Sequence, residues 1–277
     1  MNTAAQTLSR NGRNASSALL PRLGTQLLGL WPQATFFALM VLGWELMARW
    51  LHSPLVPHVL PIFQELVKIS VDGFAFSEIW ATFERMSLGF LLALIVALPI
   101  GIAAAVSRTA EKFFEPGVIL GLTVPGLVWA LLCVIWFGVS LWTPVISVAL
   151  GVLPSLVIAV QQGVRSLSLE TREMVRVFRL KRSIVVRRIW LPLLYAFIVS
   201  GCRVGFSIAW KVIVLVEIFG MSNGVGYQLN AQFSTQNVEG VIAWTLAFWL
   251  AMIVIEHLVF RPLDRHANHW KKQAAHE

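Results

Sequence analysis

Three charged side chains and Ser207 interrupt one long apolar segment of the sequence. Arg203, Ser207, Lys211 and Glu217 lie between residues 193 and 220, among mostly aliphatic and aromatic neighbours. An ionisable group in a membrane-spanning helix is costly to bury, so it usually faces a protein interior or an aqueous cavity. Arg203 and Glu217 would lie about 21 Å apart along a helix axis. Each therefore needs a partner or water outside its own helix, and the segment is a candidate lining for a polar path.

Two interpretations of this segment stay open. In the first, it lines a translocation route with Ser207, Lys211 and Glu217 along it, and Lys211 attracts an anionic solute. In the second, its cations pair with carboxylates of neighbouring helices, such as Glu45 or Glu256. For Glu217, which comes near the end of the segment, a structural role is a further alternative.

Patterns for covalent and metal chemistry are absent from the sequence. It contains no phosphate-binding Gly-Lys-Ser/Thr loop, so the chain does not hydrolyse ATP by that chemistry. His257, His266 and His269 lack acidic or Cys ligands at suitable spacing, so no metal site is predicted. Cys133 and Cys202 lie in apolar runs and are interpreted as small buried hydrophobes. We therefore expect no cofactor on this chain, no catalytic residue, and an energy source on another subunit.

Composition indicates that the elements holding these residues are membrane helices. The chain has 277 residues, of which 57% are hydrophobic and 13% charged; a soluble domain carries about 25% charged residues. The apolar residues gather in runs near the ~20 residues that a helix needs to cross a bilayer. The net charge of +8 fits Lys and Arg in cytoplasmic loops better than nucleic-acid binding, so no nucleic-acid partner is predicted.

The predicted fold is all-α and polytopic, with six membrane-spanning helices. They cover residues 32–51, 86–107, 116–138, 141–161, 193–220 and 241–263. Mixed apolar and charged spacing over 54–83 predicts an amphipathic helix at the membrane interface. The domain prediction is a flexible cytosolic tail over 1–25, a transmembrane domain over 26–265 and a cytosolic tail over 266–277.

Two pairs of small residues are expected to let helices pack closely. Gly117 with Gly121, and Gly201 with Gly205, have the four-residue spacing that brings helix backbones together in lipid. We interpret both pairs as ordinary packing within one subunit.

Basic residues predict the orientation. Residues 163–190 carry eight Lys or Arg against two Glu, whereas residues 221–238 carry no Lys or Arg. Because basic loops stay in the cytoplasm, the first segment is expected inside, both termini with it, and the second segment outside. Residues 221–238 would gate the outer mouth, touch a binding protein, or form a solvated linker.

The cytoplasmic loop over 163–192 has a helical pattern of its own. Its apolar residues recur at helical spacing with arginines between them: Met174, Val177, Phe178, Ile184, Val185 and Ile189. An amphipathic helix tethered at both ends to membrane helices can dock on a soluble partner and transmit its movement. The pattern therefore predicts a coupling element.

This loop resembles the "EAA" loop in permeases of ATP-binding-cassette importers. Glu173-Met174-Val175, Arg179, Ile189 and Leu191-Pro192 fall at the spacing of that motif. The family has two alanines and a glycine where this sequence has Met174, Val175 and Arg179. A left-handed turn costs a residue other than glycine about 1–2 kcal/mol, so either the turn differs here or its strain is tolerated.

Other motifs resemble the branch of this family that imports sulfonates, taurine, nitrate and thiamine precursors. The resemblance covers roughly residues 35–265. It is carried by Thr82, Arg85, Gly89-Phe90, Pro116, Pro125, Phe137-Gly138, Pro154, Gly163, Glu217-Ile218-Phe219-Gly220 and Gly224-Val225-Gly226-Tyr227.

The resemblance implies a permease subunit that moves a small solute, with an anion favoured, by alternating access. It implies a homodimer, two cytosolic ATPase subunits that hold ATP and Mg²⁺, and an extracytoplasmic substrate-binding protein. The location that it implies is a bacterial plasma (inner) membrane. The residues implied in ATPase docking are Glu173, Met174, Val175, Arg176, Phe178, Arg179, Leu180, Arg182, Ile189, Leu191 and Pro192. A stand-alone secondary transporter or channel is the alternative, and it would need a coupling-ion site at broken helices. An intramembrane enzyme would need paired catalytic groups at one depth.

Overall fold

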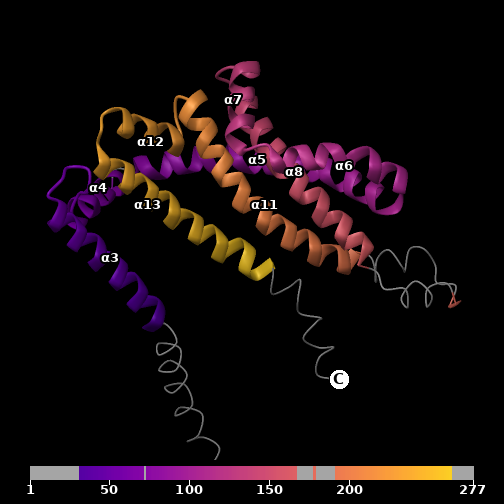
Figure 1. The fold of residues 1–277 in the computed structure, drawn as a ribbon, viewed down its shortest axis with the longest axis horizontal. Helices are drawn as coiled ribbons and strands as arrows, with labels where there is room; N and C mark the ends of the chain where they lie inside the picture. The colour runs from indigo at the N-terminus through magenta and orange to yellow at the C-terminus, as the bar shows by residue number, and fades with distance from the viewer. Residues whose placement is uncertain (1–30, 72, 167–176, 179–190, 264–277) are drawn as a thin grey trace, which may run out of the picture. The chain divides into compact units, whose positions relative to one another are not determined.

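Every regular element of the described chain is a helix. The computed structural model describes residues 31–71, 73–166, 177–178 and 191–263 (Figure 1). The chain divides into two compact units, Met1–Phe63 and Gln64–Glu277. The predicted tails over 1–25 and 266–277 lie outside the described residues.

The first unit contains helix α3 (Trp31–Leu51), in which Ala48 is the one buried residue. Its apolar side chains point outward on all sides, as expected for a helix in contact with lipid. Near its end, the Glu45 carboxylate accepts hydrogen bonds from Arg49 Nε at 2.9 Å and from the Val59 amide at 3.2 Å. Glu45 therefore binds the chain segment that follows α3, a contact that differs from the suggested pairing of Glu45 with the cations of residues 193–220.

Helices α4 (Val59–Val71) and α5 (Phe74–Val106) replace the predicted interfacial segment and second span. The amphipathic helix is present as α4, but the prediction is wrong over residues 74–83, which begin the 33-residue α5. Gly73 separates the helices in a left-handed conformation, with φ of +69°, which glycine adopts without steric penalty. The mixed spacing on which that prediction rests comes from Glu65, Lys68 and Asp72, all of which precede α5, so it does not extend to residues 74–83.

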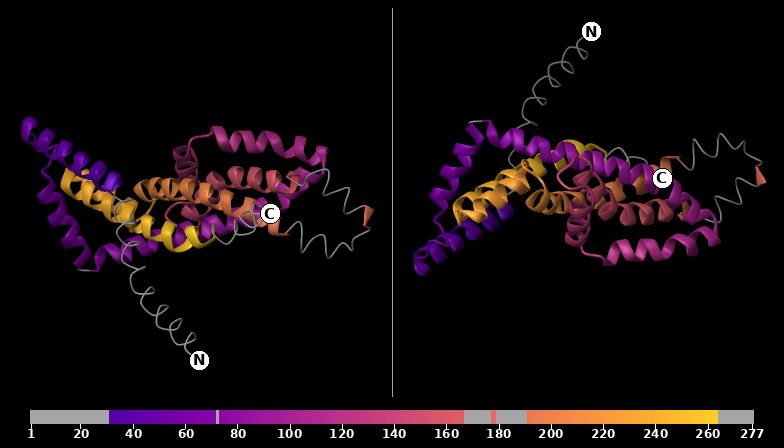
Figure 2. Two further views of the ribbon diagram at one scale, coloured as in Figure 1. Left: turned by 90° about the horizontal axis from the view of Figure 1, so that it is seen from below. Right: turned by 90° about the horizontal axis from the view of Figure 1, so that it is seen from above.

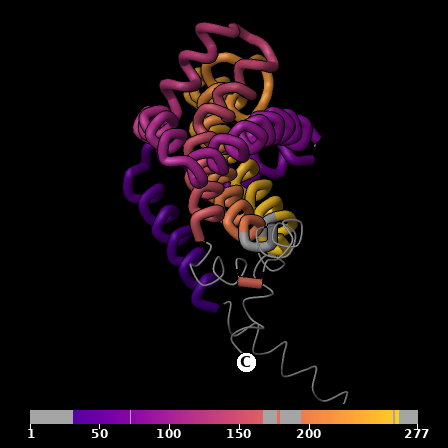
Figure 3. Tube along the Cα trace, turned by 90° about the vertical axis from the view of Figure 1, so that its right-hand side faces the viewer, coloured from indigo at the N-terminus to yellow at the C-terminus, as the bar shows by residue number. Residues whose placement is uncertain are grey.

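The predicted third span is not one helix. Helix α6 (Arg108–Thr123) and helix α7 (Gly126–Phe137) are bent by 99° at the break between them, a turn visible in Figures 1 and 3. Val124 is extended, with ψ of 122°, and Pro125 follows it. Proline disfavours the helical conformation in the residue before it and has no N–H to donate, so the helix ends here.

The remaining elements are helix α8 (Trp142–Arg165), helix α11 (Leu191–Gly220), helix α12 (Val225–Ser234) and helix α13 (Val238–Ile255), which continues into the π-helix η2 (Glu256–Phe260). The pair α11 and α12 is bent by 53°. The solvated-linker interpretation is therefore wrong for residues 225–234. In the described residues, 4 helices are long and apolar enough to cross a membrane, or up to 6 if each bent pair is one span.

Small residues set the packing of the second unit. Helices α5, α8 and α11 pack against one another, and Figure 2 shows α6 alongside α8. Along α5, the residues facing this core are buried and small at intervals of three or four: Gly89, Ala93, Ala97, Gly101 and Ala104. A Cβ atom on Gly101 would lie 2.7 Å from Val160 Cβ and 2.9 Å from the Val157 carbonyl oxygen. The backbones of α5 and α8 are therefore in close contact.

Three of the four glycines predicted to form packing seams do so within the subunit. Gly121 contacts Pro154, Gly201 contacts Ala159, and a Cβ on Gly205 would lie 3.0 Å from Val152 Cγ1. Gly117 has nothing within 4 Å of its added Cβ position. The packing interpretation is confirmed for these three, and Gly117 faces open space in the single chain.

Candidate functional site

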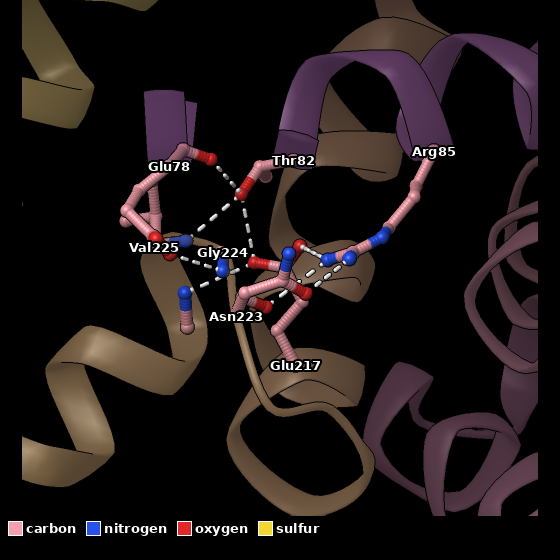
Figure 4. A network of polar contacts seen from close by, with 8 residues as sticks. Glu78, Thr82, Arg85, Glu217, Asn223, Gly224 and Val225 are labelled. Atoms are coloured by element: carbon pink, nitrogen blue, oxygen red, sulfur yellow. Dashed lines mark hydrogen bonds and ion pairs between the residues drawn. The ribbon is translucent and has the colours of Figure 1, made fainter. Parts of the chain in front are cut away.

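The end of α11 carries a buried polar network whose centre is Glu217. Its carboxylate is fully buried, at 0% exposure. Oε1 accepts a hydrogen bond from Arg85 Nη1 at 2.9 Å, and Oε2 accepts from Thr82 Oγ1 at 2.8 Å. Figure 4 shows Thr82 and Arg85 reaching across from α5 to Glu217. The network therefore joins two helices at residues 135 positions apart in the chain.

The same network fixes the bend between α11 and α12. The Gly226 amide donates to Glu217 Oε2 at 3.0 Å, and the Val225 amide donates to Thr82 Oγ1 at 2.9 Å. The Gly224 amide donates to the Glu78 carboxylate (Figure 4). Each of these three amides opens α12, where a helix leaves its first N–H groups without internal partners. Side chains of α5 and α11 thus cap the N-terminus of α12.

Glycine is required at two of these positions. Gly224 has φ of +105° and ψ of 167°, a region that is essentially restricted to glycine. A Cβ atom on Gly224 would overlap the Glu217 carboxylate, and one on Gly226 would lie 2.6 Å from Glu217 Cβ. Glu217 can approach the turn this closely because neither residue has a side chain.

Arg85 completes the network on its other side. Its Nη1 donates to the Asn223 carbonyl oxygen at 3.0 Å, and its Nη2 donates to Asn223 Oδ1. Among the buried side-chain polar atoms of the described residues, Trp129 Nε1 is the one without a partner. The network is therefore satisfied internally, which favours the structural interpretation of Glu217; its assignment to a pathway stays a prediction.

Sequence reasoning identified part of this network. Thr82, Arg85, Glu217 and the glycines were among the residues that carried the family resemblance, but Glu78 and Asn223 were missed. A signal for Glu78 was present, because Glu78, Thr82 and Arg85 follow the four- and three-residue spacing that places side chains on one helix face.

A second polar feature runs along the exposed side of α11. Ser200, Arg203, Ser207 and Lys211 recur every three or four residues and are exposed in the single chain. Ser207 Oγ donates to the Arg203 carbonyl oxygen at 3.1 Å, and Lys211 Nζ lies 5.9 Å from the Trp210 ring centroid. We call these four residues the polar face of α11. It contains two of the predicted pathway residues, Ser207 and Lys211, and is separate from the buried Glu217.

Arg203 has the carboxylate partner that the structural interpretation named. Its Nη2 lies 2.6 Å from Glu256 Oε1, and Glu256 begins the π-helix η2. The prediction of a pair with Glu256 is confirmed. The ion pair joins α11 to η2, the π-helix that continues α13.

Most of the predicted coupling residues lie outside the described part of the chain: Glu173, Met174, Val175, Arg176, Arg179, Leu180, Arg182 and Ile189. Val177 and Phe178 are described, and their side chains are 75% and 71% exposed. Leu191 and Pro192 form the first turn of α11, where proline is tolerated because the first N–H groups of a helix need no internal acceptor. The docking assignment remains a prediction.

Within residues 31–71, 73–166, 177–178 and 191–263, no group of three or more His, Cys, Asp or Glu side chains is placed to hold a metal ion. His257 Nδ1 lies 2.9 Å from the Ile253 carbonyl oxygen in its own helix. Cys133 is buried, and Cys202 is partly buried.

Comparison with known proteins agrees with this arrangement. Residues 97–261 match the family model described as binding-protein-dependent transport system inner membrane component. An aliphatic sulfonates transport permease protein of Bacillus subtilis (strain 168) is 29% identical over 76% of this chain and 74% of its own length. The taurine transport system permease protein of Escherichia coli (strain K12) is 24% identical over 85% of this chain and 88% of its own length.

A solved structure shares the fold. An inward-facing structure of the MetNI methionine ABC transporter aligns with a TM-score of 0.58 and 13% identity, covering 70% of this chain and 94% of the matched chain. The resemblance to the sulfonate, taurine and nitrate branch is confirmed by the relatives. The chain is a multi-pass permease component of an ATP-binding-cassette importer and is not itself an ATPase. This assignment replaces the two alternatives, a stand-alone transporter and an intramembrane enzyme. With more than half of its length matched by the family model, this chain belongs to the binding-protein-dependent transport system inner membrane components.

Proposed function

We propose that two copies of this chain enclose a path for a small anionic solute, lined by the polar face of α11. The observation that supports this proposal is a difference in polarity between this face and other exposed surfaces of the chain. Val254 of α13 and Ile135 of α7 are apolar and exposed, as lipid contact requires, whereas Ser207 and Lys211 are polar and exposed. Polar side chains at membrane depth face a protein or a water-filled cavity, so the polar face needs one of these opposite it.

The preference for an anion follows from the charge of this face. Lys211 and Arg203 are its ionisable members, and both are cationic. Glu256 offsets the charge of Arg203 at 2.6 Å, so the net positive charge of the face comes from Lys211. The names of the taurine and nitrate permeases also fit a small solute with a negatively charged group.

The coupling loop over residues 163–192 would dock on a cytosolic ATPase subunit, one for each copy. The ATPases would supply ATP and Mg²⁺, since no cofactor is assigned to this chain. Phe178, exposed at 71%, supports docking because an exposed aromatic side chain is a common anchor in protein interfaces. Closure of the ATPases on ATP would bring the two loops together and change which side of the path is open.

The proposed orientation places both termini and the coupling loop in the cytoplasm. The basic segment 163–190 and the uncharged segment 221–238 support it. The bend between α11 and α12 would then lie at the extracytoplasmic side, where a substrate-binding protein delivers the solute.

A pull-down tests the coupling assignment. The tagged chain would be extracted from its native membranes in mild detergent, and co-purifying proteins identified by mass spectrometry. We expect an ATPase subunit with the wild type and its loss with Glu173→Lys. Glu170→Lys makes the same charge change in the same loop outside the motif, so it should retain the ATPase. Recovery of the ATPase with Glu173→Lys, or its loss with both variants, would contradict docking through Glu173.

The solute is tested on the binding protein recovered in the same experiment. Its melting temperature would be measured with taurine, nitrate and an aliphatic sulfonate, and with an uncharged sugar as the control. A shift with an anion alone supports the proposal. A shift with the sugar alone would contradict the assignment of an anionic solute.

A further inference from the structure

The ends of three helices meet at Arg165, the last residue of α8. Its Nη1 lies 2.8 Å from Glu111 Oε1, and its Nη2 lies 2.6 Å from Glu111 Oε2. Nη2 also donates to the Ala104 carbonyl oxygen at 3.0 Å, in the last turn of α5. Gln161, one turn earlier in α8, donates from Nε2 to Glu111 Oε1 at 3.1 Å. We call Ala104, Glu111, Gln161 and Arg165 the Arg165 clamp.

The geometry of the clamp restricts both the distance between Arg165 and Glu111 and the relative orientation of their side chains. A guanidinium that bonds both oxygens of one carboxylate has a planar, two-point contact that restricts rotation. The Ala104 carbonyl lies at the C-terminal end of a helix, where cations are favoured. The Arg165 and Glu111 side chains are 43% and 33% exposed. The clamp therefore fixes the orientation of the start of α6 relative to the end of α8.

Apart from this clamp, helix α6 contacts the rest of the chain through a few side chains on one face, such as Val118 and the Gly121 position. None of its residues is buried. A cavity of about 210 Å³ lies beside the clamp, lined by Glu111 and Gln161 together with Phe114, Val118 and Val157 among others. Gly121 touches Pro154 near the other end of α6. The clamp is thus the polar contact that ties the first turn of α6 to the end of α8.

The clamp also lies at the start of the proposed coupling loop. Ser166 follows Arg165 and ends α8, so a displacement of the loop acts first on the residue that holds Glu111. Helix α6 leads to the 99° bend and α7. Movement of the loop thus has a short mechanical route to α6 and, through it, to α7.

We propose that Glu111 and Arg165 are positioning residues that transmit ATPase-driven movement of the coupling loop to α6 and α7. The proposal rests on the proposed function, because it requires an ATPase at the loop. It assigns to the α6–α7 pair a share in the conformational change, in addition to the route through α11.

Hydrogen exchange of the assembled complex tests this inference without knowledge of the solute. The chain with its ATPase would be compared in the nucleotide-free state and after trapping with ATP, Mg²⁺ and vanadate. In the wild type we expect trapping to change deuterium uptake both in residues 167–190 and in α6 and α7. In Glu111→Gln we expect the change in residues 167–190 to persist and the change in α6 and α7 to be lost.

Two further variants separate coupling from folding. Lys112→Gln removes a neighbouring exposed charge and should behave like the wild type. The exchanged pair Glu111→Arg with Arg165→Glu restores opposite charges, so it should recover at least part of the response in α6 and α7. Melting temperature and co-purification of the ATPase would be measured for every variant.

The outcomes distinguish the two proposals. If the wild-type chain binds no ATPase, the proposed function fails and the clamp inference falls with it. If the wild type responds in residues 167–190 and in α6 and α7, but Glu111→Gln responds equally in α6 and α7, the clamp inference alone is overturned. Loss of ATPase binding in Glu111→Gln would also overturn it, because the clamp would then serve assembly.

Discussion

At the scale of single residues, the charged side chains within the apolar helices differ in burial and in pairing. Glu217 is enclosed at 0% exposure and bonded to Arg85, Thr82 and the Gly226 amide. Arg203 is paired on an exposed face, and Lys211 is exposed on the same face. Enclosure with full hydrogen bonding is typical of a structural charge, whereas an exposed charge at membrane depth needs water or a partner subunit.

Arg85→Ala is expected to destabilise the chain. Removing one partner of a buried ion pair leaves the other charge uncompensated, which costs about 3–5 kcal/mol. The free energy of unfolding in detergent would be measured by chemical denaturation. Arg49→Ala is the matched control, since Arg49 pairs with Glu45 while its own side chain is 70% exposed. An equal loss of stability in both variants would contradict the view that the Glu217 network holds α12 in place.

At the scale of elements, small residues and breaks decide how the helices assemble. Gly89, Ala93, Ala97 and Gly101 let α5 touch α8, and Pro125 ends α6 so that α7 leaves at 99°. Without a hydrophobic driving force between helices in lipid, such close packing is a main source of association. The seam of α5 is therefore expected to tolerate added volume poorly.

Gly101→Ala is expected to destabilise the fold even though alanine favours helices. The new Cβ would lie 2.7 Å from Val160 Cβ and 2.9 Å from the Val157 carbonyl oxygen, and overpacking of this kind costs about 1–3 kcal/mol. Gly43→Ala is the control, because nothing lies within 4 Å of its added Cβ; there helix propensity favours alanine by about 1 kcal/mol. Thermal unfolding in detergent should move the two melting temperatures in opposite directions, and a rise for Gly101→Ala would refute close contact of α5 with α8.

At the scale of the whole molecule, the single chain leaves the polar face of α11 uncovered. Ser207 and Lys211 are exposed, and the family is built from permeases that work in complexes with other subunits. A second copy placed opposite this face would enclose a water-filled path between two such surfaces. This arrangement makes a prediction about solvent access in the assembled transporter.

Ser207→Cys is expected to react with a hydrophilic maleimide in membranes that contain the assembled complex, because thiol labelling requires water. Val254→Cys should not react, since Val254 is an apolar residue of α13, 53% exposed in the single chain, and is expected to face lipid. Both variants would be made after replacing Cys133 and Cys202 by alanine, and labelling would be read by mass spectrometry. If Ser207→Cys stays unlabelled, the polar face is buried in protein and the proposed path is wrong.

The sequence by itself determined the fold class, the family and the position of most helices. Apolar runs of bilayer length specify membrane helices because a lipid environment leaves the backbone few alternatives, so α3, α8 and α11 fall close to their predicted ranges. The pairing of Arg203 with Glu256 could also be predicted from the sequence, because a membrane-embedded cation requires a partner and the apolar segments contain few carboxylates.

Only the tertiary structure decided the angles between broken helices and which charges are enclosed. Residues 74–83 were predicted to lie at the membrane interface, but they belong to α5, where the Gly224 amide donates a hydrogen bond to the Glu78 carboxylate. Pro125 marks the break between α6 and α7 in the sequence, but the 99° angle between the two helices is a property of the folded chain. The separation of Glu217 from Ser207 and Lys211 has the same cause: one helix presents different faces to different neighbours, and these neighbours come from distant parts of the chain.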